Sequence, residues 1–293
     1  MSLQHRSELK RNSGHGAALE RLERRLVKAW EAEDGYLIEQ LAGMIYDRLV
    51  RSEPTQASVV LEQNARRLAQ AGKPAEAAEL AIRLVRHWRE IETRPFDLDR
   101  LQQIVLNPLQ SQSGVEAARA RAMVLEAALA WCRAASVAGT EPPKSQYALL
   151  DALVDAYVLC AEWPRAQYQV LCRGGPAERD LAFLDEQLGP HLGNEVERML
   201  ARTRFVLFYS LVGNHDAAQA LAAAIQEKHP SAPLTNLTSF FVQVLDQSRN
   251  ADANKRRALR SLVDELRRVY RWAFTLDPEL STLVDDILKA RNM

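Results

Sequence analysis

The sequence predicts an all-α protein, specifically an α-solenoid of stacked antiparallel helical hairpins. The chain of 293 residues contains 43 alanines but only 12 glycines and 12 prolines, and aromatic residues make up 6% of it. Alanine favours helices, whereas glycine and proline interrupt them, so this composition is typical of a largely helical chain. Apolar residues recur at three- and four-residue steps, and no window keeps the period of two that indicates a strand.

Bulk composition excludes several classes of protein. Thirty-eight Lys and Arg balance 38 Asp and Glu, so the net charge gives no general attraction to nucleic acid. No apolar run reaches the 18 residues of a transmembrane helix, and we therefore expect no direct insertion into a membrane. Three cysteines without a Cys-x-x-Cys pair are typical of reduced thiols, and the polar start lacks the apolar stretch of a secretory signal. We therefore expect a cytosolic protein.

Turn residues divide the first part of the chain into four helices. Residues 1–15 are polar and aperiodic, and we expect them to form a disordered leader. Asp34-Gly35 interrupts the apolar periodicity, and Pro54 opens a new helix. Gly72-Lys73-Pro74 combines a glycine that stops one helix with a proline that starts the next. The predicted helices are 17–31, 36–49, 55–71 and 74–92.

The rest of the chain repeats this rhythm, with breaks at turns such as Asn107-Pro108 and Gly189-Pro190. About fourteen helices are expected in total, in a single solenoid domain over 16–291. Its N-terminal half covers about 16–140 and its C-terminal half about 141–291. The further helices are predicted at 97–107, 114–137, 143–161, 164–172, 176–188, 192–212, 214–228, 234–247, 253–275 and 278–291.

A weak internal repeat supports the solenoid. Gly72 is followed by Ala77-Ala78, and Gly213 is followed by Ala217-Ala218 at nearly the same distance. Trp163 with Ala166 forms a looser third copy. In each copy a turn is followed by a small residue that lets two helices pack closely, which is the logic of tetratricopeptide-type repeats. The spacing between copies is irregular, so the repeat is degenerate.

No arrangement of side chains predicts catalysis. The six histidines are scattered, and the sequence contains neither a His-Glu-x-x-His zinc motif nor a phosphate-binding Gly-x-x-x-x-Gly-Lys loop. Cys160 and Cys172 are better interpreted as small core residues than as nucleophiles. We therefore expect a binding protein without a metal or cofactor, and not an enzyme.

Two groups of residues are candidate partner contacts. Arg66-Arg67 interrupt an apolar helix, so at least one of them is expected to point to solvent. The helix near 234–247 has more apolar residues than one narrow stripe needs. Either it is fully buried, or it forms a groove for the helix of another protein. The residues in question are Leu234, Leu237, Phe240 and Phe241.

Four stretches occur in an order that resembles a known family. They are Asp34, Tyr36 and Gln40 with Arg48; Gly72 with Ala77-Ala78-Glu79-Leu80; Trp163 to Leu171; and Glu227-Lys228-His229-Pro230-Ser231. Together they resemble the Golgi-to-ER-traffic protein four family, the scaffold of the transmembrane-domain recognition complex in animals. The resemblance covers about 17–290.

This resemblance implies a non-enzymatic scaffold for the targeting of tail-anchored membrane proteins. The N-terminal half would dock a targeting ATPase, and we assign Arg48, Arg66 and Arg67 to that contact. The C-terminal half would hold a ubiquitin-like protein, and we assign Leu234, Leu237, Phe240 and Phe241 to it. A hetero-oligomer is therefore expected.

The chain also departs from the family pattern. Gly43 and Met44 stand where the family has Arg-Thr, and Leu49 replaces a tyrosine, so the ATPase-facing surface is expected to differ. An alternative is another helical-repeat adaptor, such as a tetratricopeptide co-chaperone or a subunit of a vesicle coat or proteasome lid.

Overall fold

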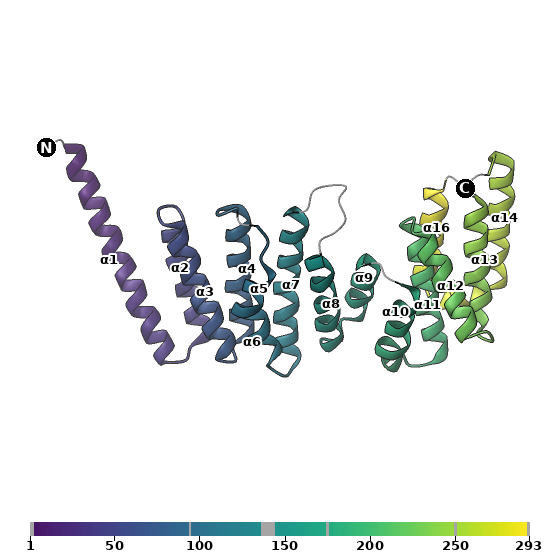
Figure 1. Ribbon diagram of the computed structural model, residues 1–293, viewed down its shortest axis with the longest axis horizontal. Coiled ribbons are helices and arrows are strands. Elements are labelled where there is room, and N and C mark those ends of the chain that lie inside the picture. The colour runs from purple at the N-terminus through teal and green to yellow at the C-terminus, as the bar shows by residue number, and fades with distance from the viewer. Residues whose placement is uncertain (1–2, 94, 136–143, 174–175, 249–250, 292–293) are drawn as a thin grey trace. The chain divides into compact units, whose positions relative to one another are not determined.

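Among the residues that the structure describes, helices are the only regular elements (Figure 1). It is a computed structural model that describes residues 3–93, 95–135, 144–173, 176–248 and 251–291, with side chains from residue 16 onward. Within these residues the predicted all-α solenoid of stacked hairpins is confirmed. The chain forms two compact units, Met1–Ala166 and Gln167–Met293.

In the N-terminal unit, successive helices pack against their neighbours in the chain. Helix α1 is assigned from Leu3 and so overlaps residues 1–15, whose disorder in solution stays a prediction. The core contains Trp88 on α4, whose ring lies 5.9 Å from that of Trp131 on α7. The helices are α1 (Leu3–Glu31), α2 (Gly35–Leu49), α3 (Pro54–Gln70), α4 (Pro74–Glu90), α5 (Leu98–Leu101), α6 (Asn107–Gln110), α7 (Val115–Ala135) and α8 (Lys144–Leu159).

The boundary between the two units differs from the one that the sequence indicates. The predicted halves meet near residue 140, in a Gly- and Pro-containing break that lies outside the described residues. Helices α7 and α8, on either side of that break, nevertheless pack against each other. The units instead meet within helix α9 (Trp163–Arg173), because turn composition does not reveal which helices share a core.

The C-terminal unit is closed by its last helix. Helix α16 (Pro278–Ala290) packs against α11 (Glu195–Leu211), although about seventy residues separate them (Figure 1). Leu280 and Ile287 of α16 lie in one core with Met199 and Leu207 of α11. The other helices are α10 (Ala177–Ala182), α12 (His215–Lys228), α13 (Pro233–Ser248), α14 (Ala253–Val269) and α15 (Arg271–Leu276). The single predicted helix 253–275 is thus two helices that meet at Tyr270.

Each copy of the internal repeat contains the same helix-ending turn. The N–H groups of Lys73, Glu162 and Asn214 each donate to a carbonyl five residues back, at 3.0, 2.9 and 2.9 Å. The preceding residue has a positive φ in every case, 71° at Gly72, 57° at Ala161 and 81° at Gly213. A fourth turn of this kind, with Glu33 at φ 53°, precedes α2. It has no glycine, and the predicted repeat did not include it.

We expect Ala161→Gly to stabilise the protein by about 1 kcal/mol, because a left-handed backbone conformation is unfavourable for any residue with a Cβ atom. Chemical denaturation followed by circular dichroism measures this change. Ala223→Gly, on the exposed face of α12, is the matched control and should destabilise the protein by about 1 kcal/mol. The same sign for both substitutions would contradict the assignment of the turn.

Two prolines lie inside continuous helical segments, although the sequence predicts that a helix ends at each of them. Pro108 and Pro190 each follow a stretch of π-helix, Gln102–Leu106 and Phe183–Leu188. Proline cannot donate to the carbonyl four residues back, and its ring clashes with that carbonyl. The wider π-turn removes the clash, as in the bond from the Asn107 N–H to the Gln102 carbonyl, so the helical path continues through the predicted breaks.

A partly buried ion-pair network around Asp185 fixes the turn between α12 and α13 to the rest of the C-terminal unit. Asp185 accepts hydrogen bonds from the Nη2 and Nε atoms of Arg202, at 2.7 and 3.0 Å. Its other oxygen lies 2.7 Å from Lys228 Nζ and 3.4 Å from His229 Nε2. Lys228 and His229 belong to the Glu-Lys-His-Pro-Ser stretch of the family resemblance. This stretch therefore has a structural role.

The environment of Asp185 favours its charged form. Burial alone would raise the pKa of Asp185, but hydrogen bonds from Lys228 and Arg202 outweigh burial and lower the pKa below its usual value. A carboxylate whose pKa is lowered by folding stabilises the fold at every pH above the pKa that it has in the unfolded chain. That contribution is lost as the pH falls toward the folded-state pKa.

We expect Asp185→Asn to destabilise the protein by about 2 kcal/mol at pH 7, because it leaves the buried Arg202 with only its contact to the exposed Glu195. The difference from the wild type should narrow below about pH 4, where Asp185 becomes protonated on unfolding. Urea denaturation at pH 7 and pH 3 measures both effects. Asp264→Asn, at an exposed position of α14, should change stability little at either pH. A constant difference between Asp185→Asn and wild type at both pH values would contradict the network.

Candidate partner-binding surfaces

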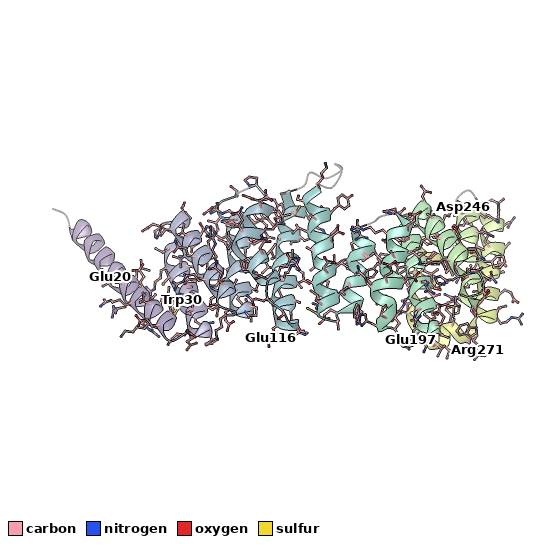
Figure 2. All side chains as sticks on the ribbon, turned by 60° about the horizontal axis from the view of Figure 1, so that its bottom comes forward. Glu20, Trp30, Glu116, Glu197, Asp246 and Arg271 are labelled. Carbon is pink, nitrogen blue, oxygen red and sulfur yellow. The ribbon has the colours of Figure 1, made fainter. Side chains whose placement is uncertain are left out.

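The two adjacent arginines of α3 contact different neighbours. Arg66 lies 3.3 Å from the Glu62 carboxylate, which also pairs with Arg100 at 2.7 Å. The guanidinium of Arg67 lies 3.9 Å from the ring centre of Trp30, near the C-terminal end of α1 (Figure 2). Successive helical residues point about 100° apart. The structure therefore does not bring Arg66 and Arg67 into one patch.

Arg48 is the third arginine that the sequence predicted as an ATPase contact. It lies half-buried in the last turn of α2, and no carboxylate of the described residues is within 4 Å of it. Its charge is therefore available, but Arg66 and Arg67 both have contacts that explain them within the fold. The assignment of all three to one contact stays a prediction.

The absence of a side chain at Gly43 brings a different arginine onto α2. Gly43 is buried, and a Cβ atom there would lie 2.8 Å from the Nη1 atom of Arg83 on α4. Any larger residue at position 43 would displace this guanidinium. The positive charge beside this position of α2 therefore comes from α4.

Exposed side chains of both helices surround this contact. Tyr36 and Met44 of α2 are 68% and 45% exposed. Arg83 is half-buried and Arg86 is exposed, one helical turn further along α4. We call these four residues the α2–α4 surface. The sequence pattern does not indicate Arg83 and Arg86, because only the helix pairing places them beside α2.

A buried hydrogen-bond chain holds the two helices in register. The ring of His87 lies between Tyr46 and Glu92, with Nδ1 3.2 Å from the Tyr46 hydroxyl and Nε2 3.1 Å from the Glu92 carboxylate. Because a carboxylate only accepts, Nε2–H is the donor and Nδ1 accepts from Tyr46. Burial, then the Asp47 carboxylate, raises the pKa of Tyr46, while Arg83 partly opposes them. The α2–α4 surface thus rests on a fixed helix pair.

The four predicted contacts of helix α13 divide into core and surface. Leu234, Leu237 and Phe241 are at most 3% exposed and pack in the core of the C-terminal unit. Phe240 is 52% exposed and lies on the face of α13 that carries the exposed polar residues Asn236 and Gln243. The helix is therefore neither fully buried nor a groove formed by all four residues. Three of the four are buried in the core, and of these four only Phe240 is available to a partner.

Further apolar side chains are exposed on the helices that follow. Helix α14 buries only Leu259 and Val263, while Leu262 and Val269 are 46% and 61% exposed. Leu276 of α15 is also exposed. None of these residues was among the contacts predicted from the sequence, although α14 has apolar residues beyond one stripe.

Two features of the described residues concern metal binding and membranes. Among these residues, no three His, Cys, Asp or Glu side chains are grouped so that they could hold a metal ion. In the same part of the chain, no helix combines the length and the hydropathy that crossing a membrane requires.

Comparison with known proteins gives a match of fold. No protein-family model and no curated protein sequence matches the chain. Among solved structures, the crystal structure of C. therm. Get4 matches with a TM-score of 0.58 and 18% sequence identity. The match covers 94% of this chain and 88% of that one. The chain therefore has the fold of Get4, as the resemblance to the Golgi-to-ER-traffic protein four family predicted.

Proposed function

We propose that this protein is a non-enzymatic scaffold in the targeting of tail-anchored membrane proteins to the endoplasmic reticulum. The observation that carries the proposal is the fold match to Get4, which extends over nearly the whole of both chains. The independent order of short motifs in the sequence supports it. Such a scaffold acts in the cytosol and works through its surfaces, as part of a hetero-oligomer.

The N-terminal unit docks the targeting ATPase through the α2–α4 surface. Tyrosine, methionine and arginine are enriched in protein interfaces, and all three occur here on two helices that share a buried hydrogen-bond chain. Arg83 supplies the charge that Gly43 lacks. Arg48, at the end of α2, extends the positive charge along the same helix.

The C-terminal unit holds the ubiquitin-like partner, with Phe240 as an anchor. A phenylalanine that is half exposed among polar neighbours is a good candidate for burial by another chain. The core beneath it, formed by Leu237 and Phe241, keeps α13 fixed. Leu234, Leu237 and Phe241 would act only by positioning Phe240.

Charge reversal at the α2–α4 surface tests the first contact. We expect Arg83→Glu combined with Arg86→Glu to weaken binding of the targeting ATPase at least tenfold. The introduced glutamates would repel the acidic surface of the ATPase that this contact requires. Calorimetric titration with the purified ATPase from the same organism measures the affinity. Binding of the ubiquitin-like protein should not change.

Arg133→Glu is the matched control, since Arg133 is an exposed arginine of the same unit on α7. This variant should bind the ATPase like the wild type. Equal losses in the control and in the double variant would indicate a non-specific charge effect and contradict the assignment. Loss of both partners together would contradict a scaffold with two separate contacts.

Substitution of the two adjacent phenylalanines tests the second contact. Phe240→Ser should leave the melting temperature nearly unchanged and weaken binding of the ubiquitin-like protein at least tenfold, because it removes an exposed anchor. Phe241→Ser should destabilise the unit by about 3–5 kcal/mol, because it empties a core position. Thermal melts and titration measure the two effects.

Two results would contradict this second contact. Phe240→Ser with unchanged binding would exclude the anchor. Binding of neither the ATPase nor the ubiquitin-like protein by the wild type, together with binding of a chaperone C-terminal tail, would favour the alternative of a co-chaperone adaptor.

A further inference from the structure

A cavity of about 520 Å³ lies within the N-terminal unit, between the turn that joins α6 to α7 and the facing side of α8. This volume is within the range of roughly 300–1,000 Å³ that is typical of sites for small ligands. Its walls combine apolar side chains with one buried cation. The residues that line the cavity include Gln110, Ser113, Val115, Arg121, Asp155 and Leu159.

Arg121 differs from the other buried arginines of the described residues. Arg173 and Arg202, 8% and 4% exposed, have carboxylate oxygens at 3.3 and 2.7 Å. Arg121 is 9% exposed and lines the cavity, yet no carboxylate of the described residues lies within 4 Å of it. Its Nε atom is buried without a hydrogen-bond partner, as is that of Arg173, so the difference is the missing carboxylate. A guanidinium stays charged, so this site lacks an anion.

Asp155, which lines the same cavity, supplies only part of that counter-charge. Burial lowers the pKa of Arg121, and the Asp155 carboxylate only partly opposes this effect. Asp155 is on the exposed side of α8, so solvent screens its charge. Among the described residues, Arg121 is therefore the buried cation whose counter-ion is incomplete.

The first turn of α7 adds a second attraction for anions. The carbonyl of Gly114 accepts the first helical hydrogen bond of α7, from Ala118, so Gly114 is the residue that precedes the helix. Glycine has no side chain that could cap the free N–H groups of this turn. Gly114 and Val115 line the same cavity as Arg121. The positive end of a 21-residue helix and a buried guanidinium thus share one space.

Two exposed aliphatic side chains line the cavity beside the exposed polar ones. Val115 and Leu159 are 50% and 63% exposed, although both are large aliphatic residues. A simple inorganic anion would leave them in water, whereas a ligand with an aliphatic group next to its anion would cover them. Gln110 and Ser113 on the same wall can hydrogen-bond a peptide backbone.

We propose that this cavity binds the C-terminus of a polypeptide whose last residue is aliphatic, with Arg121 as the counter-ion of the terminal carboxylate. The α-carboxylate and side chain of one terminal leucine or valine carry both required groups. The fork of the guanidinium matches the two carboxylate oxygens. This site lies apart from the α2–α4 surface and does not depend on the function proposed above.

Binding of two matched peptides to the full-length chain tests the site. The probe is a fluorescein-labelled heptapeptide ending in Ala-Leu, either with a free carboxylate or with a C-terminal amide. Fluorescence anisotropy should give at least tenfold tighter binding for the free acid, since a charge-assisted hydrogen bond contributes at least about 1.4 kcal/mol. Replacing the terminal leucine by glycine should also weaken binding.

Substitution of Arg121 separates a binding role from a structural one. Arg121→Met should abolish the preference for the free acid and melt at or above the wild-type temperature, because it removes an unpaired buried charge. Arg133→Met, at an exposed position of the same helix, should bind like the wild type. A large drop in melting temperature with Arg121→Met would indicate a structural cation and overturn the proposal.

Three other results would also overturn it. They are equal binding of the acid and the amide, no binding of either peptide at millimolar concentration, and competition by 4-methylpentanoate that is as strong as competition by the unlabelled peptide. The last result would assign the cavity to a free aliphatic acid instead of a chain terminus.

Discussion

The close approach of neighbouring helices at left-handed turns is the constraint on which the N-terminal unit depends. After Gly72 the chain reverses within three residues, and the completely buried Ala77 and Ala78 allow α4 to lie against its neighbours. Larger side chains there would separate the helices and open the core. The same turn with a buried alanine recurs at Gly213 and Ala218. These turns fix the direction of each helix relative to the preceding one. The helix directions in turn determine which side chains lie together on a surface.

The buried arginines that the structure describes are of two kinds: those that pair with a carboxylate within the fold, and one that can bind a ligand. Arg202 holds Asp185 and connects α11 to the turn before α13, so its charge is used within the fold. Arg121 has the same chemistry and similar burial but no such carboxylate, and it lines a cavity. Since an unpaired buried charge costs several kcal/mol, its retention is explained most directly by a ligand. Residue type alone does not distinguish the two cases.

The α2–α4 surface illustrates how a position without a side chain can receive a charge from another helix. Gly43 has no side chain of its own, and this absence leaves the space that the Arg83 guanidinium occupies beside α2. Only the packing of the two helices reveals this charge, because residues 43 and 83 lie far apart in the sequence.

The sequence by itself determined the helical class, most helix positions and the turn-plus-alanine repeat, because these follow from propensity and period within short windows. Tertiary structure alone decided that α16 returns to α11, that Phe241 is core while Phe240 is exposed, and that Pro108 lies inside a helix. The tertiary structure also decided which arginines pair with a carboxylate. The physical reason is that burial and charge pairing depend on contacts between residues far apart in the chain, which local periodicity does not contain.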